Sequence, residues 1–167
     1  MPRPPRPRLA AVVVLLVLMA GCSAPVDVTA GPHAAAPACG QVMVASPDTL
    51  LGADRRDTAS QATTAWGDPP VTLRCGVEVP GPTTDRCISV ETSGGSSVDW
   101  VSLQQTDELE DGGEWTFVTY GREPAIEVVV PVEQVGGGQV TAYLAELGEA
   151  ASLVPAERSC VGAEDVS

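Results

Sequence analysis

Alternating apolar and polar positions in the middle of the chain predict a series of β-strands. In the segment from Val71 to Val79, the side chains of Val71, Leu73, Cys75 and Val77 would share one face. Further strand signals follow in RCISVE, SVDWVSL, EWTFVTY and AIEVVVPV. Polar or glycine-rich turns separate them (PGPTTD, TSGGS, QTDELEDGG and GREP). This hairpin spacing predicts a mostly antiparallel sheet of about five strands.

One helix is predicted before these strands in the sequence and another after them. Between Gln139 and Val154 apolar residues recur at steps of three and four, as in an amphipathic helix, and Pro155 ends the pattern. Before the strands, the segment CGQVMVASPDTLLG is apolar but interrupted by Pro47, which predicts a short or broken helix. Together these elements indicate an α+β fold with an N-terminal short helix and a C-terminal amphipathic helix packed on one face of the sheet. The apolar positions of the second helix are Val140, Leu144, Leu147, Ala151 and Val154.

The first residues of the chain have the pattern of an export signal. Three arginines precede an unbroken apolar run from Leu9 to Ala20. Such a run is too short to cross about 30 Å of hydrocarbon, but it matches the apolar region of a signal peptide. The stretch LMAGC that ends it resembles the bacterial lipobox, with Met19 where leucine is more usual. The resemblance implies that residues 1–21 are a lipoprotein signal peptide and that the Cys22 thiol is acylated; the alternative is an ordinary signal peptide with a chance cysteine.

Lipid on Cys22 would determine where the protein lies. Because two or more acyl chains hold a protein stably on a bilayer, we expect Cys22 to anchor the chain to the extracytoplasmic face of the cell membrane. The following segment, SAPVDVTAGPHAAAPA, consists mainly of small residues, which predicts a flexible tether over residues 22–38. A single domain over residues 39–160 and an acidic tail over residues 161–167 complete the predicted organisation.

The charge of the chain restricts its partners. The sequence has 22 acidic residues and 9 basic residues, all of them arginine, and three of these arginines lie in the predicted signal peptide. So acidic a chain is unsuited to nucleic acid and to electrostatic binding of anionic lipid headgroups.

Four cysteines remain after Cys22, an even number in an exported chain, so we predict two disulfides. A hairpin turning at Gly81 would place Cys75 opposite Cys87, which leaves Cys39 to pair with Cys160. The crossed and the sequential pairings are the two alternatives. A four-cysteine zinc site is the less favoured interpretation, since no C-x-x-C spacing occurs.

The sequence offers little for catalysis. The only histidine, His33, lies in the predicted tether, and there is no lysine. This disfavours Ser-His and Cys-His pairs, Schiff bases and Walker A loops, and leaves carboxylates, hydroxyls and arginine. We therefore predict no enzyme activity, no cofactor and no metal.

Three weaker features are interpreted as structural. The acidic stretch from Asp107 to Glu114 is interpreted as a solvated turn, with weak divalent-ion binding as the alternative. The three glycines at 136–138 lack the other residues of a phosphate-binding loop, so they are interpreted as a connector. Three tryptophans are expected in the core with their indole N–H groups at its rim, and a shallow aromatic ligand surface is the alternative. They are Trp66, Trp100 and Trp115.

Three motifs point to a family. The stretches AWGDPPVTLRCGV at 65–77, VDW at 98–100 and YGREPAIEVVVP at 120–131, all behind the lipobox, resemble the actinobacterial lipoprotein family of unknown function numbered 3515. The resemblance extends from about Cys39 to Val154. It implies an actinobacterial lipoprotein, and it carries over no catalytic or binding residue because the family has no established activity.

Within these motifs, Trp66, Asp68 and Arg122 are the candidate binding residues. Arg122 is interpreted as a structural residue that pairs with Asp68 or Asp99; facing a ligand carboxylate or phosphate is the alternative. From the sequence we expect a lipid-anchored binding or interaction module of the cell envelope, whose partner is an envelope protein or a cell-wall component. An accessory subunit of an envelope enzyme is the alternative, and a carboxylate-dependent cell-wall hydrolase ranks third.

Overall fold

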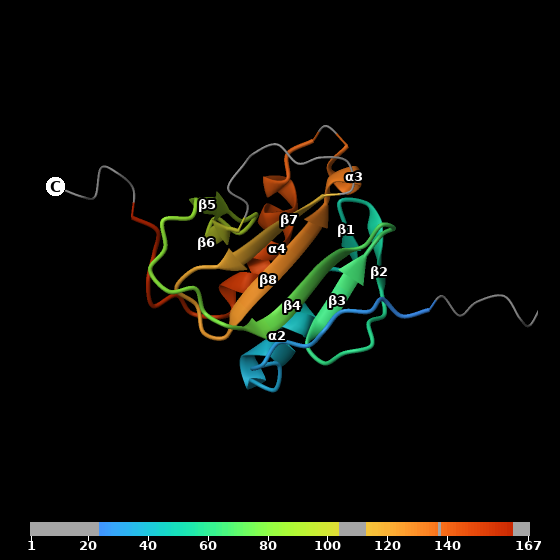
Figure 1. Ribbon diagram of the computed structural model, residues 1–167, viewed down its shortest axis with the longest axis horizontal. Helices are drawn as coiled ribbons and strands as arrows, with labels where there is room; N and C mark the ends of the chain where they lie inside the picture. Colours follow the sequence, from blue (N-terminus) through green and yellow to red (C-terminus); the bar gives the residue numbers. More distant parts are fainter. Residues whose placement is uncertain (1–23, 104–112, 137, 162–167) are drawn as a thin grey trace, which may run out of the picture.

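The computed structural model describes residues 24–103, 113–136 and 138–161. Eight strands follow a first helix, and two further helices follow the strands (Figure 1). In chain order the elements are α2 (Pro37–Ala45), β1 (Thr49–Leu50), β2 (Ala53–Arg56), β3 (Thr63–Trp66), β4 (Val71–Val77), β5 (Cys87–Glu91), β6 (Ser97–Ser102), β7 (Glu114–Thr119), β8 (Ala125–Pro131), α3 (Val132–Val135) and α4 (Thr141–Ser152).

The strands form one antiparallel sheet in the order β1-β2-β3-β4-β8-β7-β6-β5. Two consecutive four-stranded meanders, β1–β4 and β5–β8, are therefore joined where β4 pairs with β8. Thr72 lies opposite Val129 and Cys75 opposite Ile126 along this junction. As a result, the chain between β4 and β5 must travel from the middle of the sheet to its edge.

Both longer helices contribute to the main hydrophobic core on one face of the sheet. The apolar side chains of α2 and α4 pack with the inward residues of β4, β6, β7 and β8, and α4 runs behind β7 and β8 in Figure 1. The predicted α+β class and antiparallel sheet are confirmed, as is the predicted C-terminal helix, which α4 forms. Fully buried residues of this core include Val42, Leu73, Trp100, Val128 and Leu147.

The expectation of about five strands is wrong because β1, β2 and β3 were not recognised. Arg55, in the middle of β2, directs its side chain to the helix face. Its guanidinium donates to the carbonyl oxygens of Met43 at 3.1 Å and Ser46 at 3.2 Å, which lie at the C-terminal end of α2. It also donates to Thr64 Oγ1 at 2.9 Å. An inward arginine that satisfies helix carbonyls breaks the apolar alternation that identifies a strand.

The prediction of a flexible tether over 22–38 is wrong for the residues from Val26 onward. Val28 and Ala34 are buried, and the backbone N–H of Val26 donates to the carbonyl of Asp57 at 2.8 Å. The backbone of Gly31 lies directly against that of Gly76, and the N–H of His33 donates to the Gly76 carbonyl at 2.8 Å. Small residues here allow close backbone contact with the sheet, so the segment belongs to the domain. Residues 22 and 23 lie outside the described residues.

Two disulfides are present, but the predicted pairing is wrong. Cys39 of α2 is bonded to Cys75 of β4, and Cys87 of β5 is bonded to Cys160, which follows α4 in the chain. This is the sequential alternative. The hairpin argument failed because β4 pairs with β8, while β5 lies at the far edge of the sheet. The first bridge is fully buried, whereas the half-buried second bridge joins the edge strand to the C-terminal segment.

No helix among the described residues is long and apolar enough to cross a membrane. The predicted signal peptide, Cys22 and the tail residues 162–167 lie outside the described residues.

Replacing Gly31 by alanine tests the docking of the N-terminal segment. A Cβ at this position would lie 2.4 Å from the Gly76 carbonyl oxygen, and backbone cannot move aside as a flexible side chain can. We expect Gly31→Ala to lower the free energy of unfolding by about 1–3 kcal/mol. Gly40→Ala is the control, since nothing lies within 4 Å of a Cβ there and alanine favours a helix. Urea denaturation measures both; equal stability of the two variants would show that the segment does not dock.

The disulfides are tested by replacing each pair with alanine. The bridges join residues 36 and 73 positions apart, so the chain-entropy model gives about 4 kcal/mol for each. Cys39→Ala with Cys75→Ala should cost more than Cys87→Ala with Cys160→Ala, because it also leaves space in the core. Denaturant unfolding compares the two double variants. A larger loss for the Cys87 and Cys160 pair would contradict the assigned burial.

Candidate binding site

The three candidate residues Trp66, Asp68 and Arg122 do not form one site. Trp66 is fully buried and its indole N–H donates to the Pro47 carbonyl at 2.9 Å. Asp68 is exposed in the β3–β4 turn, where the nearest cation, Arg56, lies 3.9 Å away. Arg122 lies in the β7–β8 loop, at the opposite end of the strands.

Arg122 acts as a structural residue through hydrogen bonds to backbone carbonyls rather than through the predicted ion pair with Asp68 or Asp99. Its side chain is buried, and its guanidinium donates to the carbonyl of Val154 and, at 3.3 Å, to that of Ser97. Burial lowers the pKa of Arg122, and nearby Asp99 opposes this effect. Asp99 in turn accepts the backbone N–H of Cys160 at 2.7 Å. Arg122 therefore ties the end of α4 and the C-terminal segment to β6.

The structure describes part of the acidic stretch and part of the glycine segment between α3 and α4. Residues 107–112 of the acidic stretch lie outside the described residues, and Glu114 begins β7. Gly136 and Gly138 lie between α3 and α4, and Tyr143 Oη bridges the two helices by donating to the Gln134 carbonyl at 2.7 Å. Burial raises the pKa of Tyr143. No group of three or more metal-ligating side chains occurs in the described part of the chain.

His33 is held in place, contrary to the expectation for a tether. Its Nε2 lies 3.4 Å from an oxygen of Glu78, and both line a hollow of about 330 Å³ with Glu123. The other residues of this hollow are alanine, valine and proline, so its lining includes no hydroxyl or thiol that a histidine base could activate.

A second hollow lies at the edge of the sheet and combines aromatic with polar side chains. One row across three strands forms its floor: the N–H of Ser102 donates to the Arg86 carbonyl at 2.8 Å, and Ser102 lies opposite Phe117. Ile88 lies two residues from Arg86 and Trp115 lies two residues from Phe117, so both side chains extend the same face of the sheet. The hollow has a volume of about 260 Å³.

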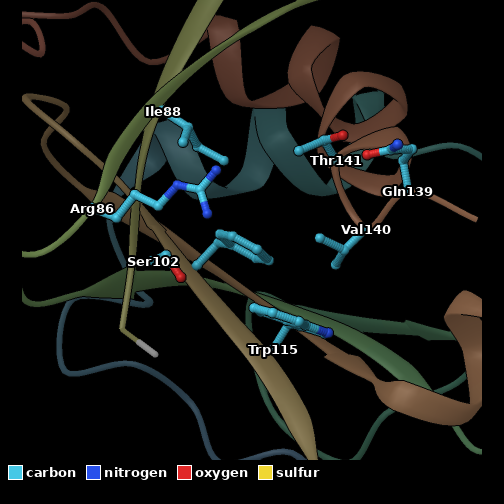
Figure 2. A pocket seen from close by; sticks show the side chains of 8 residues that line it. Arg86, Ile88, Ser102, Trp115, Gln139, Val140 and Thr141 are labelled. Carbon is cyan, nitrogen blue, oxygen red and sulfur yellow. The ribbon is translucent and has the colours of Figure 1, made fainter. Parts of the chain in front are cut away.

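The start of α4 closes the other side of this hollow. Gln139, Val140 and Thr141 face the aromatic residues, and the guanidinium of Arg86 points into the space between them (Figure 2). The rings of Trp115 and Phe117 lie nearly parallel, with centroids 6.4 Å apart. The hollow therefore has an apolar wall, a cation and hydroxyl or amide groups around one small volume.

Among these residues, the sequence placed only Trp115 on a candidate ligand surface, through the alternative of an aromatic surface, whereas Gln139 and Val140 were predicted only as part of the second helix. Arg86 and Ser102 were missed because their proximity depends on the pairing of β5 with β6.

The fold and this hollow define a disulfide-linked α+β domain with a small edge pocket. The chain belongs to the family described as "Protein of unknown function (DUF3515)", which matches residues 8–158. Neither the curated proteins nor the solved structures contain a match to it.

The role of Arg122 is tested by comparing it with the exposed Arg158. Arg122→Ala leaves the buried Val154 carbonyl and the Ser97 carbonyl without this donor and removes the charge that interacts with Asp99, so we expect a loss of about 3 kcal/mol in the free energy of unfolding. Arg158→Ala makes the same change in charge and should stay within about 0.5 kcal/mol of the unmodified protein. Urea denaturation distinguishes them; an unchanged midpoint for Arg122→Ala would contradict a structural role.

Proposed function

We propose that this chain is a lipid-anchored binding module of the cell envelope, tethered through Cys22 to the extracytoplasmic face of the membrane. The observation that carries the binding role is the edge pocket, where aromatic side chains, a guanidinium and polar groups converge on one volume. Ligand sites typically combine an apolar lining with a few such polar groups.

The two disulfides support an extracytoplasmic location. Disulfides persist in oxidising surroundings and are rare in proteins of the cytosol. The residues matched to the family, 8–158, include most of the apolar run and Cys22.

The docked N-terminal segment gives the proposed anchor a short reach. The recorded contacts of this segment with the domain begin at Val26, so only residues 22–25 separate the acyl chains from folded structure. A domain anchored in this way would stay close to the membrane surface and bind a partner there, either another envelope protein or a cell-wall component.

Metabolic labelling with a fatty-acid analogue tests the anchor. We expect the protein to carry the label and to fractionate with membranes, and Cys22→Ser to abolish both because it removes the acylated thiol. Ser23→Ala is the matched control and should keep the label. An unlabelled protein released into the medium, or full labelling of Cys22→Ser, would overturn the proposal.

A further inference from the structure

The edge pocket differs from two other hollows of the molecule in the charged residues that line it. The hollow near His33 includes Glu78 and Glu123, and another beside α4 includes Glu91 and Glu146. Among the described residues, the lining of the edge pocket contains no carboxylate, although the chain has a formal net charge of −13. Arg86 is the charged residue in this described part of the lining.

We propose that the edge pocket binds a small organic carboxylate whose body is a flat or compact apolar group. This inference rests on the proposed binding function and names the ligand class for the same site. The Arg86 guanidinium would hold the carboxylate, and the apolar body would lie against Trp115, with Val140 opposite.

The chemistry of Arg86 fits a carboxylate in particular. A guanidinium presents five N–H donors in a planar fork, so it can hold a carboxylate through two parallel hydrogen bonds while keeping other contacts. Ser102, Gln139 and Thr141 add hydroxyl and amide donors around the same space. The first turn of α4 has no acidic side chain that would repel an anion.

The apolar wall and the volume restrict the rest of the ligand. The nearly parallel rings of Trp115 and Phe117 form a continuous apolar surface, and Ile88 extends it. Aromatic surfaces of this kind favour a stacked ring or a packed hydrocarbon. A volume of about 260 Å³ lies below the roughly 300–1,000 Å³ of drug-sized sites, so the body is one ring or one short branched chain.

Titration of the mature lipoprotein in nanodiscs tests the ligand class, with benzoate as the probe and tryptophan emission as the signal. Trp66 and Trp100 are fully buried in the core, so the response should come from Trp115 and vanish in Trp115→Phe. Benzamide has the same ring without the charge. We expect saturable binding of benzoate, with a dissociation constant at least about tenfold smaller than that of benzamide.

The decisive variant is Arg86→Gln, which should remove the preference for benzoate over benzamide. Arg158→Gln is the matched control, because it makes the same change in net charge at an exposed position outside the pocket, and it should keep the preference. Circular dichroism of each variant checks that the fold is retained.

Three results would overturn the inference: equal affinity for benzoate and benzamide, an unchanged preference in Arg86→Gln, or a response to N-acetylglucosamine without one to benzoate. The last would make the pocket a neutral sugar site and leave the proposed binding module intact. An absence of any response would also overturn it, whereas failure of the anchor itself would appear in the labelling of Cys22.

Discussion

The pairing of β4 with β8 is the contact on which the rest of the structure depends. It joins two meanders that are each local in sequence, and it brings together residues more than 50 positions apart. Arg74 and Glu127 lie opposite each other on this junction and form a double hydrogen bond, with distances of 2.5 and 3.0 Å. On the other face, Leu73 and Val128 are fully buried beneath the helices. The ion pair on one face of the sheet and the apolar pair on the helix face together fix the register in which the two meanders pair.

This junction also determines what lies at the edge. Because β8 occupies the place beside β4, the second meander extends outward and ends in β5. Helix α4 then lies against β5, β6 and β8, and the edge pocket forms where that helix begins. The Cys87–Cys160 bridge holds the same edge strand to the segment after α4. The strands that line the pocket are thus held in place by the β4–β8 junction on one side and by the Cys87–Cys160 bridge on the other.

The sequence predicted the parts of this structure that depend on local periodicity, and missed those that depend on long-range pairing. The helix around Leu144 and the strands β4 to β8 follow from regular apolar spacing. Strand β2 was missed because Arg55 points inward to satisfy helix carbonyls. The disulfide of Cys75 was assigned to the wrong partner because a hairpin was assumed where the chain crosses to the sheet edge. For the same reason, only Trp115 of the pocket could be foreseen, whereas Arg86 could not.

Native-state hydrogen exchange of the backbone amides tests most directly whether the two meanders form one unit through β4 and β8. The account predicts that the amides of Leu73 and Val128 exchange only through global unfolding, and that protected amides of β3 and of β6 share that same free energy of opening. Exchange of β1–β4 at a distinctly lower free energy than β5–β8 would show that the halves open separately. That result would contradict the central role of the β4–β8 junction.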